Sequence, residues 1–382
     1  MKKAVMAIVT AVIVCTAAAG VYIIASGTGS GGETDGTISI VDGSGATITL
    51  SEPLTGVVTA NTNIPKAMKI LGLTDELKGL SFYTASTNQS NWDLYSPLFN
   101  KDVVHMPLIQ SMTAESIVAM TGCKYIICPV TSMTITASQE TSFKEFGITI
   151  IRLDCNGDSA LDDLEKLTVL FGKTDKVVDA YDSYCRMYDG VVSTVTAAVA
   201  ASPSTQDRTF LSYMSSLHAF YNETSAISVM TESIYGKNAL RGTGLPLIGP
   251  TNPAGEMGTR EVIKTKDSNR PIDKIFVRGT ATTNTPSAAL AVWQNVASVL
   301  PITGYDLSPA KTDEVYVFHT NIMSGMLSFI GYVAIAEVCG IDTGLSISDL
   351  IAAFNTAYGF TEATSGYVFK MTGGGTGFAK IA

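Results

Sequence analysis

Short apolar segments alternate with segments of helical periodicity along most of the chain, and this alternation constrains the fold more than any other feature. The predicted strands lie at 56–59, 79–81, 125–128, 148–153, 209–213, 275–277 and 315–318. The predicted helices lie at 65–71, around Glu115, and at 259–264, 288–300, 324–339 and 348–358. Such alternation is typical of mostly parallel sheets covered by helices. The sequence therefore predicts an α/β protein, which opens with a β-hairpin at 37–50 around Asp42-Gly43.

A long helical region divides the alternation into two parts. Apolar residues recur every three or four positions from Ser159 to about Ala200, and Gly172 interrupts the pattern. Residues 174–200 would form a rigid helix about 40 Å long, at about 1.5 Å per residue. A helix of that length can join two lobes. We therefore expect an N-terminal lobe at 37–158, connecting helices at 159–200 and a C-terminal lobe at 201–382.

The first 36 residues differ from the rest. Lys2 and Lys3 precede 22 residues without a charge, at 4–25, which predicts an export signal. The segment is long enough to span a bilayer, but the small residues at 17–19 suit cleavage, so a signal peptide and a retained membrane anchor both stay open. Residues 26–36 have the composition of a flexible tether. We expect an extracytoplasmic protein, tethered to or near the cell membrane.

Composition and motifs argue against several classes of function. The net charge of -9 and the lack of Lys/Arg clusters exclude nucleic acid as a partner. The segment that ends in Lys173-Thr174 lacks the first glycine of a phosphate-binding loop, the glycines of residues 371–378 do not make the GxGxxG pattern of a dinucleotide site, and no GxSxG or HExxH motif occurs. The triplet Gly157-Asp158-Ser159 could suggest a serine hydrolase, but Asp158 or Ser159 is better explained as the N-cap of the helix that follows. Five scattered cysteines beyond residue 25 predict buried free thiols. We therefore expect no enzyme, no metal site and no cofactor of its own.

Five segments, in this order and spacing, resemble the class III solute-binding proteins of ABC importers, which capture ferric siderophores, haem or cobalamin outside the membrane. They are IVDGSGATITL, VVTANTNIPKAMKILGL, TAESIVAMTGCKYIICP, LDDLEKLTVLFGKTDKVVDAYDSY and DEVYVFHTNIMSGMLSFIGYVAIAEVCGID. The resemblance covers residues 37–360. Two segments depart from the family pattern: Gly122-Cys123-Lys124 replaces its Pro-Asp turn, and TGLPLIGPTNPAGEM replaces a glycine-asparagine segment.

Residues that follow predicted strands are the candidate ligand contacts, since ligands of open α/β sheets bind outside the carboxyl ends of strands. The candidates are Asn61, Tyr83, Trp92 and Thr131 in the first lobe, and Tyr213, His218, Arg278 and His319 in the second. This aromatic and polar set suits a large, flat, partly apolar metal complex. The set contains one arginine, whereas an anionic siderophore chelate would call for several. The composition of the set therefore favours haem or a corrinoid. Burial in a core is the alternative for Tyr213, and hydrogen bonding to backbone is the alternative for both histidines.

Two acids are candidates for contact with a permease. In the family that the chain resembles, an exposed glutamate at the start of a helix in each lobe docks onto the importer. Glu115 and Glu261 fall on these positions. The alternative for Glu115 is a solvated first-turn acid that complements the helix dipole.

The resemblance implies a monomer that captures an iron complex (siderophore or haem) or a corrinoid in the cleft between its lobes and delivers it to an ABC importer. A surface-anchored structural or adhesion protein on the same fold is the first alternative. A metal-dependent chelatase or hydrolase that uses His218 or His319 is the second, but three scattered histidines fall short of the usual ligand set.

Overall fold

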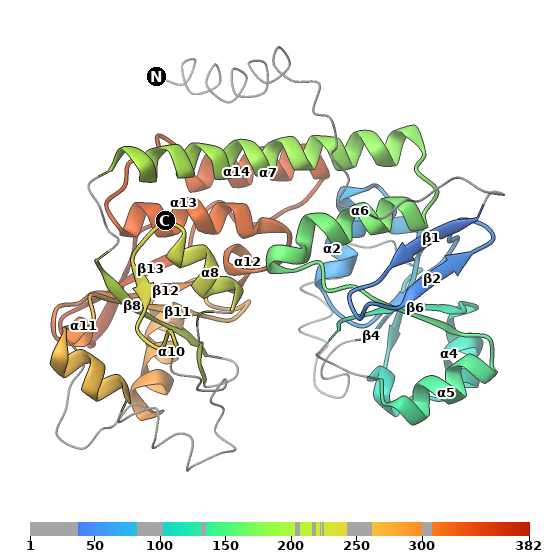
Figure 1. The fold of residues 1–382 in the computed structure, drawn as a ribbon, viewed down its shortest axis with the longest axis horizontal. Helices are drawn as coiled ribbons and strands as arrows, with labels where there is room; N and C mark the ends of the chain where they lie inside the picture. The colour runs from blue at the N-terminus through green and yellow to red at the C-terminus, as the bar shows by residue number, and fades with distance from the viewer. Residues whose placement is uncertain are drawn as a thin grey trace. The chain divides into compact units, whose positions relative to one another are not determined.

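The computed structural model describes most of the chain beyond the leader. The described residues are 37–81, 102–130, 135–202, 207–215, 219–221, 223, 225–242, 262–299 and 308–382. They fall into two compact units, unit 1 (Met1–Gly190) and unit 2 (Val191–Ala382). The long green helix of Figure 1, α7 (Asp175–Ala201), has 27 residues, begins in unit 1 and ends in unit 2. No helix within the described ranges is long and apolar enough to cross a membrane. The predicted export signal and tether lie outside these ranges.

Unit 1 contains the predicted hairpin and a parallel sheet. Strands β1 (Ile38–Val41) and β2 (Thr47–Leu50) pair antiparallel, as the sequence predicted. The parallel sheet has the order β5-β4-β3-β6-β7. Its strands are β3 (Val57–Thr59), β4 (Leu77–Ser81), β5 (Val104–Met106), β6 (Tyr125–Cys128) and β7 (Thr149–Arg152). The helices are α2 (Asn63–Ile70), α4 (Ala114–Thr121), α5 (Ala137–Glu145) and α6 (Ala160–Leu170), with short 3-10 turns at Thr74–Glu76, Ile109–Ser111 and Gly157–Ser159.

Local sequence explains how the helices of unit 1 start and stop. Thr113 begins α4 with a capping box, in which its side chain accepts the N–H of Ser116, and Gly122 ends this helix with a left-handed φ of 70°. The break predicted at Gly172 is confirmed, because α6 ends at Leu170 and this glycine has φ 94°. Ser159 occupies the N-cap position of α6, but its hydroxyl accepts no backbone N–H there.

Unit 2 contains a larger mixed sheet of order β10-β8-β11-β12-β13-β14, with β9 paired to β8. Its strands are β8 (Thr209–Met214), β9 (Ala219–Tyr221), β10 (Lys237–Asn238), β11 (Lys274–Arg278), β12 (Val315–Phe318), β13 (Val368–Thr372) and β14 (Gly377–Lys380). The pairs of β10 with β8, β8 with β11 and β11 with β12 are parallel, whereas β9, β13 and β14 each pair antiparallel with a neighbour.

Helices cover both faces of the unit 2 sheet (Figure 1). They are α8 (Ala226–Glu232), α10 (Pro286–Val299), α11 (Ser308–Lys311), α12 (Thr320–Met323), α13 (Ser328–Val338) and α14 (Ile347–Tyr358), and residues 262–269 are helical as well. Alternate strand residues such as Leu211 and Val277 pack with Val292 and Trp293 of α10 in one core. The predicted fold class, mostly parallel sheets covered by helices and one long helix, is confirmed.

Candidate ligand-binding residues

In unit 1, Asn61 is the described candidate at a strand end. It follows β3, and its side-chain oxygen accepts the backbone N–H of Ile64 at 2.9 Å, so this residue shapes the start of α2. Lys66 lies one turn further along α2 and is 7% exposed. Sequence reasoning missed this lysine. The available signal was a cation in the short apolar helix that follows a strand end, where a ligand of opposite charge could contact it.

Five of the ten predicted site residues lie outside the described ranges. They are Tyr83, Trp92, Thr131, His218 and Glu261. Their roles stay predictions.

In unit 2, Arg278 ends β11 and is held by partners from two other segments. Its Nε donates to the hydroxyl of Thr320, at the start of α12, at 2.9 Å. Burial raises the pKa of the Tyr221 hydroxyl, and the Arg278 guanidinium, which hydrogen-bonds to that hydroxyl, partly opposes the rise. The arrangement places a half-buried cation and two hydroxyl groups at the carboxyl end of the sheet, where they can hold the oxygen atoms of a ligand.

A threonine-rich loop follows Arg278. The N–H of Thr280 donates to the Thr283 hydroxyl at 2.9 Å, and the hydroxyls of Thr280 and Thr282 lie 3.0 Å apart. The loop is tight at Gly279, where an added Cβ would lie 2.7 Å from the Thr283 hydroxyl oxygen. None of these threonines is among the predicted ligand contacts, although the threonine-rich run at residues 279–285 carries the signal.

Tyr213 lies inside the core of unit 2. Its ring is fully buried and packs edge-to-face against Phe220, with ring centroids 4.9 Å apart. Both residues belong to the same core as Val277 and Trp293. The ring therefore contributes to packing in this structure.

His319 follows β12 directly and is 7% exposed. Its Nδ1 accepts the backbone N–H of Asn321 at 3.1 Å, which makes it the N-cap of α12. Its Nε2 lies 3.0 Å from the carbonyl oxygen of Ala281, in the loop after β11. Both ring nitrogens are thus engaged within unit 2.

The described candidate for permease contact, Glu115, is exposed in the first turn of α4. The position complements the helix dipole and also leaves the carboxylate accessible to a partner. Both interpretations of this residue fit the position.

The described cysteines are unpaired by disulfides, and three of the five are buried. Cys123, Cys128, Cys155, Cys185 and Cys339 are free thiols. Burial raises the pKa of Cys128 to about 12, although the nearby Arg152 opposes the rise. Among the described residues no group of three or more His, Cys, Asp or Glu side chains could hold a metal ion.

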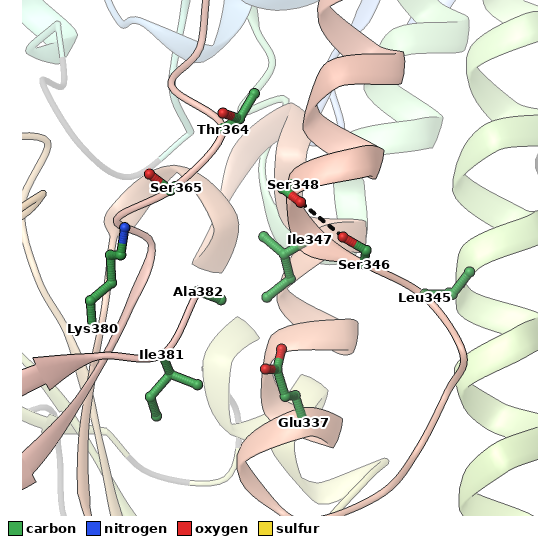
Figure 2. A pocket seen from close by; sticks show the side chains of 10 residues that line it. All are labelled: Glu337, Leu345, Ser346, Ile347, Ser348, Thr364, Ser365, Lys380, Ile381 and Ala382. Atoms are coloured by element: carbon green, nitrogen blue, oxygen red, sulfur yellow. Dashed lines mark hydrogen bonds between the residues drawn. The ribbon is translucent and has the colours of Figure 1, made fainter. Parts of the chain in front are cut away.

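A cavity of about 400 Å³ lies on the surface of unit 2 and is separate from the strand-end residues (Figure 2). Glu337 of α13 points into it, and Ser346 and Ser348 at the start of α14 hydrogen-bond to each other at 2.9 Å on its wall. Burial raises the pKa of Glu337. No predicted ligand contact lines this cavity.

Comparison with known proteins identifies the fold. No protein-family model matches the chain, and no curated protein matches it. Solved structures do match: this chain has the fold of the TroA-like periplasmic binding proteins, which confirms the resemblance at the level of fold.

Three solved structures illustrate this likeness. The TroA-like periplasmic binding protein FepB from Veillonella parvula is 15% identical, with 88% of this chain and 100% of that chain covered and a TM-score of 0.62. An ABC-type Fe3+-hydroxamate transport system protein from Saccharomonospora viridis is 14% identical, with coverages of 79% and 99% and a TM-score of 0.53. The periplasmic haem-binding protein RhuT from Roseiflexus is 13% identical, with coverages of 74% and 97% and a TM-score of 0.52.

Proposed function

We propose that this protein is an extracytoplasmic solute-binding protein that captures an iron complex, either a siderophore chelate or haem, or a corrinoid, and delivers it to an ABC importer. The observation that carries the proposal is the fold, which matches FepB over the whole of that chain. The names of the similar structures favour a ferric hydroxamate or haem, whereas the corrinoid rests on the sequence resemblance. A binding protein of this kind has no catalytic residue and no cofactor of its own.

The strand-end residues of each unit supply the ligand contacts in this proposal. Arg278, Thr320 and Tyr221 form the best-defined group, and Thr280 and Thr282 add hydroxyls beside it. Such donors match the oxygen atoms on the outside of a ferric chelate or the propionates of haem. Glu115 and Glu261 would contact the permease, and the leader would hold the protein near the membrane as a monomer.

Titration of the protein without its leader tests the proposal. The probes are ferrioxamine B, ferric enterobactin, haemin and cyanocobalamin, and intrinsic tryptophan fluorescence and calorimetry report binding. We expect one probe to bind, and we expect Arg278→Gln to weaken that binding about tenfold, as for the loss of one charge-assisted hydrogen bond. Arg270→Gln, which changes an exposed arginine of the same unit, is the matched control. If no probe binds, the proposal fails and the structural or adhesion alternative takes its place.

A further inference from the structure

His319 joins three segments of unit 2 that meet at the carboxyl end of the sheet. Its backbone N–H donates to the carbonyl of Tyr367 at 2.8 Å, and the two rings lie edge-to-face with centroids 5.1 Å apart. Through the ring it also contacts the backbone of Asn321 in α12 and of Ala281 in the threonine-rich loop. The buried imidazole of His319 therefore contacts the loop after β11, the start of α12 and Tyr367, which directly precedes β13. We call this set of contacts the His319 junction.

These contacts require one form of the imidazole. The carbonyl oxygen of Ala281 can accept but not donate, so Nε2 carries a proton. The N–H of Asn321 can donate but not accept, so Nδ1 carries none. The contacts at 3.0 Å and 3.1 Å thus select the neutral ring with its proton on Nε2.

A second proton would break this junction. Nδ1 would become a donor directed at the N–H of Asn321, and α12 would lose its cap. The charged groups on the packed segments are Glu362 and Arg278. Glu362 accepts from the side chain of Asn321 at 2.9 Å and from the Tyr367 hydroxyl at 3.4 Å, and Arg278 donates to Thr320 in α12.

We propose that His319 is a positioning residue that holds the threonine-rich loop and α12 in place when neutral and releases both when protonated. Histidine is the side chain that gains charge as the pH falls from neutral, so we expect the release in acid. The inference goes beyond the proposed function, since every contact of the junction is made by residues of unit 2 itself. The release would lower the affinity of the protein for an iron complex in acid. This consequence rests on the proposed function.

Hydrogen exchange of the ligand-free protein tests the proposal. Exchange of the peptides that cover 279–285 and 319–327 is measured at about pH 7.5 and about pH 5.5 and divided by the intrinsic rates at each pH. In the wild type we expect the protection of both segments to fall about tenfold in acid, as for the loss of one hydrogen bond at a buried site. Peptides from β8 and β11 should keep their protection.

The variant His319→Asn separates titration from structure. Asparagine is a good N-cap and can accept the N–H of Asn321, but it does not titrate. We expect its protection in both segments to be independent of pH, with His319→Gln as a second non-titrating variant. The matched control His105→Gln, in unit 1, should keep the wild-type response.

Two results overturn the proposal. One is a wild type whose two segments show the same protection at both pH values, and the other is an acid response that persists in His319→Asn. Should both variants at this position unfold, nitrogen NMR of labelled histidine in the wild type decides. The Nδ1 signal must report an unprotonated nitrogen at about pH 7.5, and its titration midpoint must coincide with the change in exchange. A protonated Nδ1 at neutral pH or separate midpoints refute the proposal.

Discussion

The carboxylate of Asp42 accepts the backbone N–H of Arg152 at 3.0 Å and so joins the opening hairpin to the edge strand β7. The two residues are 110 positions apart in the chain. The other carboxylate oxygen of Asp42 accepts the N–H groups of Ser44 and Ala46, at 2.9 and 3.1 Å, and thereby holds the hairpin turn. The N–H of Gly43 completes the junction, since it donates to the carbonyl of Arg152 at 2.7 Å.

Removal of this carboxylate should destabilise unit 1. Asp42 is 4% exposed, so Asp42→Ala leaves the part-buried N–H of Arg152 without its acceptor. We expect the free energy of unfolding to fall by about 2–4 kcal/mol, as for the loss of a buried hydrogen-bond network. Urea denaturation followed by circular dichroism measures the change. Asp179→Ala, which removes an exposed carboxylate of α7, should change stability by less than about 0.5 kcal/mol. Equal effects of both changes would contradict the role of Asp42.

The hairpin shows what the sequence can and cannot predict. Alternating apolar residues around Asp42-Gly43 determine the strands and the turn, because these depend on neighbours in the chain. The bond to Arg152 depends on how the hairpin packs on β7, and no local pattern encodes such a contact. The same holds at the candidate site. Arg278 is predictable as the residue that ends an apolar strand, whereas its partners Thr320 and Tyr221 come from other segments.

The elements that sequence reasoning missed lack a strong apolar period. β5 has three residues, and β13 and β14 flank a glycine-rich turn whose glycines 373–375 all have positive φ. This turn explains the glycines of residues 371–378, which form a β-hairpin rather than a nucleotide-binding loop. The helix predicted at 324–339 begins at Ser328 instead, because Gly325 at φ 71° and a 3-10 turn, Gly325–Leu327, separate it from α12.

Acid should weaken unit 2 through Glu314. Burial alone would raise the pKa of this carboxyl, but hydrogen bonds from Lys274, Lys370 and Tyr316 outweigh burial and lower it. A lowered folded pKa means that the carboxylate stabilises the fold above its ordinary pKa, about 4.3, and that this stability is lost as the pH falls from there through the folded value.

Glu314→Gln checks this pH dependence. At neutral pH we expect the variant to be less stable by about 1–2 kcal/mol, since it loses charge-assisted hydrogen bonds at a partly exposed site. The difference from the wild type should shrink as the pH falls below about 4.3. Urea denaturation between about pH 3 and 7 measures both. A constant difference over this range would refute the assignment, and Glu52→Gln, at an exposed position, serves as the control.

The thiols should differ in reactivity according to burial. Burial raises the pKa of Cys128 to about 12, so very little thiolate forms at about pH 8. Cys155 is fully buried, and its pKa is also raised by burial. We expect iodoacetamide to leave both unlabelled in the folded protein and to label both in urea, as peptide mass spectrometry would detect. Cys185 is partly exposed and provides the internal comparison. Labelling of Cys128 as fast as Cys185 would contradict the burial seen here.

The last prediction concerns the role of Glu115 and rests on the proposed function. The start of α4 does not depend on this side chain, because Thr113 and Ser116 cap the helix, so Glu115→Ala should cost less than about 1 kcal/mol of stability. An exposed carboxylate of this kind can instead orient the protein on a partner that carries arginines.

We therefore expect Glu115→Ala and Glu261→Ala to keep the affinity of the wild type for the probe that binds, for example ferrioxamine B, but to reduce uptake of its iron by cells. Uptake of radioactive iron into cells that carry each variant in place of the native protein measures this effect, and calorimetry measures affinity. Glu145→Ala removes an exposed glutamate at the end of α5 and should leave uptake unchanged. Loss of ligand affinity in Glu115→Ala would assign this residue to the binding site instead, and wild-type uptake by both variants would remove it from the permease contact.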